Sequence, residues 1–208
     1  VINGSKSFIT HGKIGGVMVV ITVTDRTKGH RGISAFIVEQ GTKGMSAGKK
    51  ENKLGMRASD TSEVVFQDCR IPETQLLGEE GQGFINTLQV LDAGRIGIAA
   101  LSVGLAQGAY EAARNYTAER KQFGRAIASF PSIQERLAAH ASAVEAARLL
   151  TYKAAWLKDQ GRNFSLTAAQ AKLKTGRLAV RATEEAVQIH GGYGYIEEYP
   201  VCRFYRDA

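Results

Sequence analysis

The sequence has few of the residues that build disulfide frameworks or metal sites. Its 208 residues include only two cysteines, Cys69 and Cys202, and four histidines. Two cysteines that lie so far apart in the sequence do not suggest a disulfide framework, and no Cys/His spacing resembles a zinc site. We therefore expect no metal site, and a reduced intracellular compartment is the default expectation.

Long apolar runs are also missing. The longest, from Gly15 to Val23, is far shorter than a bilayer span and is followed by Thr24, Asp25 and Arg26. We expect no membrane span and no targeting segment, because Val1 to Gly4 are typical of the end of a strand that enters a turn. The chain would then begin and end within a fold, as part of a longer polypeptide.

No concentrated basic run accompanies the net positive charge. The chain has 27 Lys and Arg against 20 Asp and Glu, a net charge of +7 that is spread along its length. This balance suits an anionic partner. Nucleic acid fits on charge alone, but no basic helix with interleaved aromatic residues supports it, so we expect no nucleic-acid partner. A phosphorylated small molecule explains the charge equally well.

The residues that are present, 44% of them hydrophobic, can form a sizeable core, and they fall into two halves. Up to about Pro72 the pattern is that of short strands separated by turn-rich segments. The strand candidates lie at 17–23, 33–38 and 63–67. This half predicts a small antiparallel sheet or part of a barrel, with open edges if further strands are missing.

From about Gly81 onward the apolar residues recur at helical spacing. Three helices are expected, over about 81–120, 131–160 and 165–190, the second opened by Pro131 and the third by Ser165 as a possible N-cap. Helices with such narrow apolar stripes need at least one more partner. The fold class is therefore α+β, a partial antiparallel sheet or barrel followed by an antiparallel helical bundle whose last helix is incomplete or missing.

Several polar residues allow both a structural and a functional interpretation. Asp92 and Arg95 lie three apart on a helix and could be a surface ion pair. Arg120 stands at a helix end, where it could complement the helix dipole or bind a phosphate. His140 and His190 lie on apolar seams, which favours histidines of the core.

The chain ends in glycines, aromatic residues and a proline. Gly191, Gly192 and Gly194 suggest a helix cap and a turn, after which Pro200 prevents simple continuation of the helix. Glu197 and Glu198 look like an acid/base pair, but adjacent carboxylates near a loop are more often simply solvated.

Eight short segments become informative when they are taken in order. They are INGSKSFIT (2–10), GISAF (32–36), KLGMRAS (53–59), FQDCRIP (66–72), LGEEGQGF (77–84), LDAGR (91–95), RKQFG (120–124) and the terminal stretch 188–208. Together they resemble the acyl-CoA dehydrogenase family across essentially the whole chain. The resemblance is closest to short-chain, butyryl-type members, notably through Leu91 to Ala99.

The resemblance implies a flavoenzyme of fatty acid β-oxidation that binds FAD non-covalently and oxidises an acyl-CoA to the trans-2-enoyl-CoA. In the family a glutamate removes the α-proton, a hydride passes to the flavin, and electrons leave to an electron-transferring flavoprotein. Residues 1–77 would belong to the middle β domain and 78–208 to the C-terminal four-helix bundle. Family members are usually tetramers, dimers of dimers. The expected compartment is the bacterial cytoplasm or, in a eukaryote, the mitochondrial matrix.

The resemblance also implies site residues. Three residues match the segment that lies against the flavin ring: Phe8, Ile9 and Thr10. Two match residues near the FAD pyrophosphate and adenine: Arg120 and Phe123. A second FAD segment matches Gln188, Ile189, His190, Gly191 and Gly192, and the family brings these last two groups to one flavin from different subunits. The positions that contact the CoA part of the substrate match Asp92, Ala93, Gly94 and Arg95.

This sequence departs from the family pattern at functional positions. Pro131 stands where many short-chain members have a glutamine that contacts FAD, and its side chain cannot replace that amide. Some branches carry the catalytic glutamate on the first bundle helix, where this chain has Gly94. The base is therefore expected beyond Ala208, in a Tyr-Glu-Gly-Thr segment, and Glu198 should not be mistaken for it. We expect no catalytic residue in this chain, which alone would be inactive.

Two alternatives stay open. An acyl-CoA oxidase-like enzyme would share the fold and reduce oxygen directly. A helical bundle that oligomerises and carries a CoA or nucleotide site, without redox activity, would share the binding residues. Flavin absorbance separates the second alternative from the enzymes, and protection of the reduced flavin from oxygen separates the first.

Overall fold

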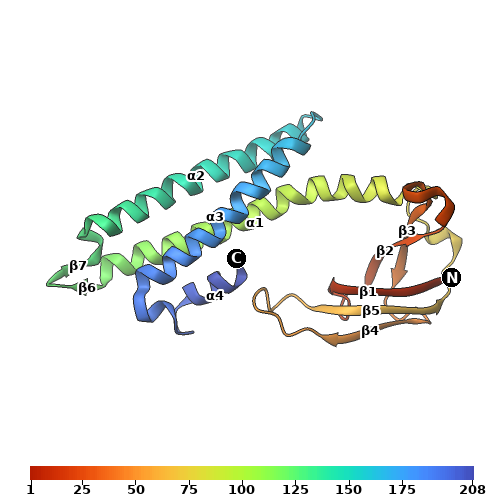
Figure 1. Ribbon diagram of the computed structural model, residues 1–208, viewed down its shortest axis with the longest axis horizontal. Helices are drawn as coiled ribbons and strands as arrows, with labels where there is room; N and C mark the ends of the chain where they lie inside the picture. The colour runs from red at the N-terminus through yellow and green to blue at the C-terminus, as the bar shows by residue number, and fades with distance from the viewer. The chain divides into compact units, whose positions relative to one another are not determined.

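The computed structural model describes residues 1–208 and divides them into two compact units, 1–90 and 91–208 (Figure 1). The first unit contains two small antiparallel sheets that do not close into a barrel. One has the order β1-β5-β4, from Ile2–Thr10, Thr61–Cys69 and Met45–Lys50. The other pairs β2 (Val17–Val23) with β3 (Ile33–Glu39). The three predicted strands are confirmed.

Residues from both sheets build the core of the first unit. The cluster contains Ile2, Val20, Val38, Val64, Phe66 and Cys69. Along β5 the buried positions Val64 and Phe66 are two residues apart, the spacing that places side chains on one face of a strand. Burial of these apolar side chains is therefore what selects the register of β5.

The expected turn after Gly4 is wrong, because β1 continues as a strand to Thr10. Its pairing with β5 shifts register between Ile2 and Gly4 and again between Lys6 and Ile9. Such bulges absorb a glycine or an irregular residue without ending a strand. The glycine that suggested a turn is thus accommodated by a local irregularity.

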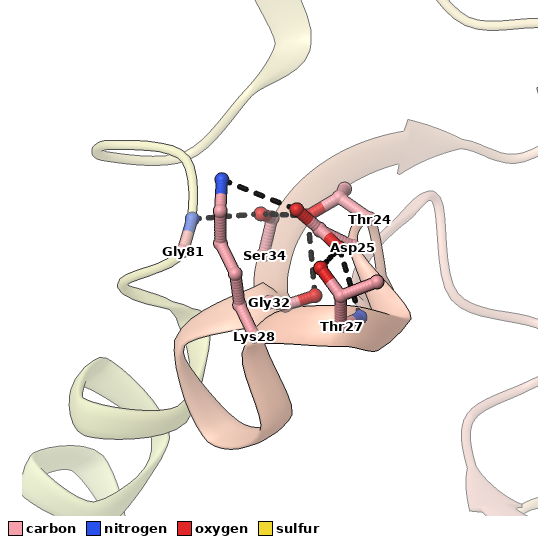
Figure 2. A network of polar contacts seen from close by, with 7 residues as sticks. All are labelled: Thr24, Asp25, Thr27, Lys28, Gly32, Ser34 and Gly81. Carbon is pink, nitrogen blue, oxygen red and sulfur yellow. Dashed lines mark hydrogen bonds and ion pairs between the residues drawn. The ribbon is translucent and has the colours of Figure 1, made fainter.

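A polar network closes the turn between β2 and β3 (Figure 2). The Thr24 hydroxyl lies 2.9 Å from that of Ser34 and donates to the Gly32 carbonyl at 3.2 Å. Ser34 Oγ also accepts from the Gly81 amide at 2.9 Å. Ser34 is fully buried, so it links the turn to the segment that precedes the long helix α1.

Asp25 caps the same turn, the 3-10 segment η1 (Arg26–Gly32). Its carboxylate accepts from the hydroxyl and the amide of Thr27, at 2.6 and 2.9 Å, and pairs with Lys28 at 3.2 Å. These interactions lower the pKa of Asp25 to about 2, and the hydrogen bond from the Thr27 hydroxyl contributes most. The carboxylate is therefore ionised at any pH at which the protein is expected to work.

The helical unit is built by α1 (Gly83–Glu119), α2 (Pro131–Asp159), α3 (Ser165–His190) and the short α4 (Pro200–Asp207). The first turns of α1 belong to the first unit. Between the helices lie the two-residue strands β6 (Lys121–Gln122) and β7 (Arg125–Ala126) and the 3-10 segments η3 (Ile127–Ser129) and η4 (Gly191–Gly194); η2 (Glu73–Gln75) precedes α1. The predicted helix bounds are confirmed, including Pro131 at the start of α2.

Small side chains let the three long helices approach closely. One buried cluster joins α1, α2 and α3 and contains Val103, Ala106, Val144, Ala147, Leu178 and Ala182. A second lies toward the end of α1 and contains Ala109, Ala113, Ala186, Ile189 and Val201. Alanine removes bulk at the helix contacts and still favours the helix, so the seam stays narrow.

By length and composition alone, α1 is long and apolar enough to cross a membrane. The core helix of a soluble protein can have the same length and composition. In this structure α1 packs Val103 and Ala106 against α2 and α3. We therefore interpret it as a bundle helix.

Candidate functional site

One cavity of the helical unit gathers residues from segments far apart in the sequence. Its volume is about 460 Å³, within the usual range for small-molecule sites. Five of the predicted cofactor residues line it: Arg120, Ile189, His190, Gly191 and Gly192. The cavity therefore lies where α1 ends and α3 passes into η4.

The two predicted cofactor segments of this unit were expected to reach one flavin from different subunits. Arg120 and the Ile189–Gly192 segment line one cavity of a single chain. The physical reason is that α1 and α3 end on the same side of the bundle, in the buried cluster around Ala113 and Ile189. The two segments therefore lie close together within one chain. Their contact with a flavin, and the subunits that supply it, stay a prediction.

The backbone around Arg120 is fixed by hydrogen bonds. Its amide donates to the Tyr116 carbonyl and its carbonyl accepts from the Ile127 amide, both at 2.9 Å. The β6–β7 hairpin between these points turns at Phe123 and Gly124, whose φ values are +51° and +77°. A bulky residue at positive φ is uncommon, and here it directs the chain back toward the cavity.

The end of α3 offers accessible backbone to the cavity. An added Cβ at Gly194 would come within 2.3 Å of the Val187 carbonyl oxygen, so only glycine lets η4 fold back onto α3. At Gly191 and Gly192 nothing lies within 4 Å of an added Cβ. Open space beside two consecutive glycines lets a ligand approach the backbone closely.

Two of the rings that line the cavity, those of Tyr116 and His190, are packed against each other. Tyr116 and His190 stack with centroids 4.2 Å apart, and Tyr199 meets His190 edge-on at 5.8 Å. Burial lowers the pKa of His190, and the hydrogen bond between its Nδ1 and the Ala186 carbonyl, 2.7 Å long, acts in the opposite direction. Burial also raises the pKa of Tyr116. Both rings are therefore neutral at neutral pH.

Arg120 is the one charged side chain that lines this cavity. Its guanidinium lies 5.5 Å from the centroid of the Tyr193 ring. No carboxylate forms an ion pair with it, whereas Arg95, Arg136, Arg148 and Arg206 each have one. An uncompensated guanidinium beside open backbone suits an anionic ligand, and its planar fork matches a phosphate.

Two predicted cofactor residues of this unit do not line the cavity. Phe123 is 91% exposed and meets Phe130 edge-on at 6.2 Å. Gln188 is exposed, and its carbonyl accepts the capping hydrogen bond from the Gly191 amide. Their side chains therefore contribute nothing to the cavity in this chain.

Phe8, Ile9 and Thr10 lie at the end of β1, in the first unit. Phe8 has φ +56° and is 77% exposed, at the second register shift of the strand. Ile9 packs against the core cluster, and Thr10 pairs with Thr61. A phenylalanine held at positive φ and left exposed is costly, which marks a position of functional interest.

The predicted substrate residues lie on α1. The carboxylate of Asp92 pairs with Arg95 and also accepts from the Ser165 hydroxyl at 2.5 Å. Ala93 and Gly94 lie between them on the same helix. The space beside Gly94 is open, because an added Cβ there would meet nothing within 4 Å. With a rise of about 1.5 Å per residue, about 36 Å of helix separates Arg95 from the end of α1. The two predicted sites of this unit are therefore separate.

The hydroxyl expected to cap α3 has another partner. The N-cap of α3 is Phe164, without a side-chain hydrogen bond, and Ser165 is the first helical residue. The Ser165 amide is capped by Asn163 Oδ1 at 3.2 Å. The expected N-cap at Ser165 is wrong because its hydroxyl binds the charged acceptor Asp92 instead.

The histidines and the two adjacent glutamates differ in how deeply they are buried. His190 is 4% exposed, as expected for a core histidine, but His140 is only half-buried, with its Nδ1 2.8 Å from the Arg136 carbonyl oxygen. Glu197 pairs with Arg206 at 3.4 Å, and both Glu197 and Glu198 are exposed.

Half of the residues that line the cavity were not predicted from the sequence. The additional residues are Tyr116, Gln122, Ile127, Tyr193 and Ile196. Tyr116 could have been found, because it lies four residues before Arg120 on one helix face. The others depend on how the hairpin and η4 fold back, which helical spacing does not report.

Comparisons with known proteins match both units. The family "Acyl-CoA dehydrogenase, middle domain" matches residues 1–69, and "Acyl-CoA dehydrogenase, C-terminal domain" matches residues 81–208. The short-chain specific acyl-CoA dehydrogenase of Clostridium acetobutylicum is 51% identical over 208 residues, which are 100% of this chain and 55% of that protein. This chain thus spans about half the length of the curated relatives it matches.

Solved structures of other proteins are also similar to this chain. That of butyryl-CoA dehydrogenase from Megasphaera elsdenii has a TM-score of 0.96 and 50% identity, covering 99% of this chain and 54% of the other. One described as the electron transferring flavoprotein of Acidaminococcus fermentans has a TM-score of 0.96 and 48% identity, covering 98% of this chain and 54% of the other. Because the C-terminal family covers more than half of its residues, this chain belongs to the acyl-CoA dehydrogenase family.

Proposed function

We propose that this chain is part of an FAD-dependent dehydrogenase that oxidises a short-chain acyl-CoA to the trans-2-enoyl-CoA and passes the electrons to an electron-transferring flavoprotein. The observation that carries the proposal is the cavity in which Arg120, without an ion pair, faces the open backbone of Gly191 and Gly192. The names of the relatives support the substrate class and the electron acceptor.

The residues present fit one half of FAD. A cavity of about 460 Å³ with one cation, two open glycines and neutral rings suits the diphosphate and adenosine part of a dinucleotide. Arg120 would hold the pyrophosphate, and the backbone of Gly191 and Gly192 would let it approach. Taken by itself, the first unit exposes the ring of Phe8 and the side chain of Thr10 beside Ile9, and such a pair would suit contact with a flavin ring. Bound FAD would supply the two-electron acceptor that this chemistry needs.

Asp92 and Arg95 would hold the CoA part of the substrate. Arg95 offers a guanidinium to its phosphates, and Asp92, fixed by Ser165, orients that guanidinium. Removal of the α-proton needs a carboxylate base within reach of that proton, on the carbon next to the thioester carbonyl. Gly94 has no side chain to serve, so we assign the base to a glutamate outside these residues. This chain would bind and orient the reactants and would not itself remove the proton.

Association with further copies belongs to the proposal. Apolar stripes stay exposed on α2 at Leu149, Tyr152 and Trp156, and on α3 at Leu166, Leu173 and Val180. The α3 residues are seven apart, the spacing of a helix seam that packs against another helix. A dimer of dimers would cover such stripes. We place the enzyme in the cytoplasm of a bacterium or the mitochondrial matrix of a eukaryote.

The test combines intact mass, a visible spectrum and reduction by butyryl-CoA without oxygen. These 208 residues account for 22.5 kDa. For a longer purified protein we expect flavin absorbance that bleaches with butyryl-CoA; for these residues alone we expect added FAD to bind without bleaching. Bound flavin that butyryl-CoA never bleaches in the longer protein would overturn the proposal. Rapid reoxidation by oxygen would favour an oxidase, and absence of flavin binding would favour a bundle without redox activity.

A further inference from the structure

We infer that Tyr193 is a positioning residue, which holds the Arg120 guanidinium at the rim of the cavity for the diphosphate of the ligand. The inference rests on the proposed nucleotide site and adds a residue to it. Tyr193 lines the cavity, and the Arg120 guanidinium lies over its ring, 5.5 Å from the centroid. A cation within about 6 Å of an aromatic face is attracted by the ring quadrupole.

The Tyr193 ring is itself held by other rings. Its centroid lies 5.2 Å from that of Tyr199, which meets Tyr116 edge-on at 6.1 Å. Tyr116 in turn stacks on His190. These four rings come from α1, the end of α3, η4 and the residue before α4, so the ring under Arg120 is tied to several elements.

The arginine needs this support because nothing else fixes its charged end. Its backbone is hydrogen-bonded, but no carboxylate pairs with its guanidinium. A free arginine side chain loses considerable rotamer entropy when it binds an anion. A ring that already confines the guanidinium removes part of that cost before the ligand arrives.

A direct role is the competing explanation, since Tyr193 is 42% exposed and could stack on the ligand itself. The two roles differ in one measurable way. A ring that acts through Arg120 contributes to binding only when Arg120 is present, whereas a ring that stacks on the ligand contributes with or without it. A double-mutant cycle separates them.

The experiment titrates the wild-type chain and its variants with ADP, the half of FAD that this cavity would hold, by calorimetry. We expect Arg120→Ala to weaken binding about tenfold or more and Tyr193→Leu to weaken it about two- to fivefold. Tyr193→Phe should bind like the wild type, because it keeps the aromatic face. In the Arg120→Ala background, Tyr193→Leu should cause no further loss.

Phenylalanine keeps the aromatic ring and leucine removes it, so a loss in Leu that is absent in Phe comes from the ring and not from the hydroxyl. Tyr195 provides the matched control, because it is 88% exposed and does not line the cavity; Tyr195→Leu should leave the affinity unchanged. Equal losses from Tyr193→Leu in both backgrounds, or no loss in either, overturn this inference alone. Absence of saturable ADP binding by the wild-type chain overturns the proposed nucleotide site and this inference with it.

Discussion

The hydroxyl of Ser165, the first residue of α3, donates a 2.5 Å hydrogen bond to Oδ2 of Asp92 on α1. The other oxygen of that carboxylate accepts from Arg95. An exposed ion pair within one helix contributes only about 0.3–0.5 kcal/mol, whereas a hydrogen bond to a charged group contributes about 1.5–3 kcal/mol. The Asp92–Arg95 pair is therefore anchored by a second helix and is more than a local surface pair.

Replacement of Ser165 should loosen this anchor. We expect Ser165→Ala to lower the free energy of unfolding by about 1–2 kcal/mol, because Asp92 loses a hydrogen bond to its ionised form. Ser165→Thr keeps the hydroxyl and should retain most of the stability. Urea unfolding of the three proteins measures the differences.

Ser142 on α2 is the matched control. Its hydroxyl donates only to carbonyls of its own helix, those of Ala138 and Ala139, at 2.8 and 3.2 Å. Ser142→Ala should change the free energy of unfolding by less than about 0.5 kcal/mol. If Ser165→Ala costs no more than this control, the contact between α1 and α3 does not carry the stability assigned to it.

Ser165 also shows where the sequence stopped being informative. The helix bounds followed from local signals, such as Pro131 at the start of α2. A serine hydroxyl before a helical pattern can cap the helix or donate to an acceptor that is distant in sequence, and the local sequence does not distinguish the two. Ser165 and Asp92 are 73 residues apart in sequence, so only the packing of α3 against α1 shows that the serine hydroxyl binds Asp92.

The cavity lining, too, could be predicted only where local motifs report it. Arg120 and the Ile189–Gly192 segment stand in motifs that the sequence displays, and the structure brings them together. Tyr193 and Ile196 enter the cavity through the fold-back of η4, which depends on Gly194 lying against Val187. The continuation of β1 past Gly4 was missed because a bulge depends on its partner strand, which no local pattern reports.

The network of Figure 2 predicts a stability effect in the first unit. Ser34→Ala would remove the acceptor of the Gly81 amide and the partner of the Thr24 hydroxyl. Because Ser34 is fully buried, we expect a loss of about 1–3 kcal/mol in the free energy of unfolding. Ser46→Ala, at an exposed position of β4, is the control and should have little effect. Equal midpoints for both variants in thermal unfolding would contradict the role of Ser34.

His190 predicts how stability changes with pH. Since burial lowers the pKa of His190 from its usual 6.5, the unfolded chain binds this proton more readily than the folded chain. The free energy of unfolding should therefore fall as the pH drops below about 6.5, toward the lower pKa of the folded state. His190→Asn can still donate to the Ala186 carbonyl but does not titrate. Urea unfolding between about pH 7.5 and 5.5 should show a shallower pH dependence for the variant. Identical slopes would mean that His190 is not buried in its neutral form.

The most direct test of the proposed site is a titration with FAD of the wild-type chain, Arg120→Ala and Arg162→Ala, followed by flavin fluorescence. Arg162 is the matched control, because its guanidinium also lies 5.5 Å from an aromatic ring, that of Trp156, but does not line the cavity. We predict that Arg120→Ala weakens FAD binding about tenfold or more and that Arg162→Ala binds like the wild type. Equal affinity of all three proteins for FAD would contradict the assignment of this cavity to the cofactor.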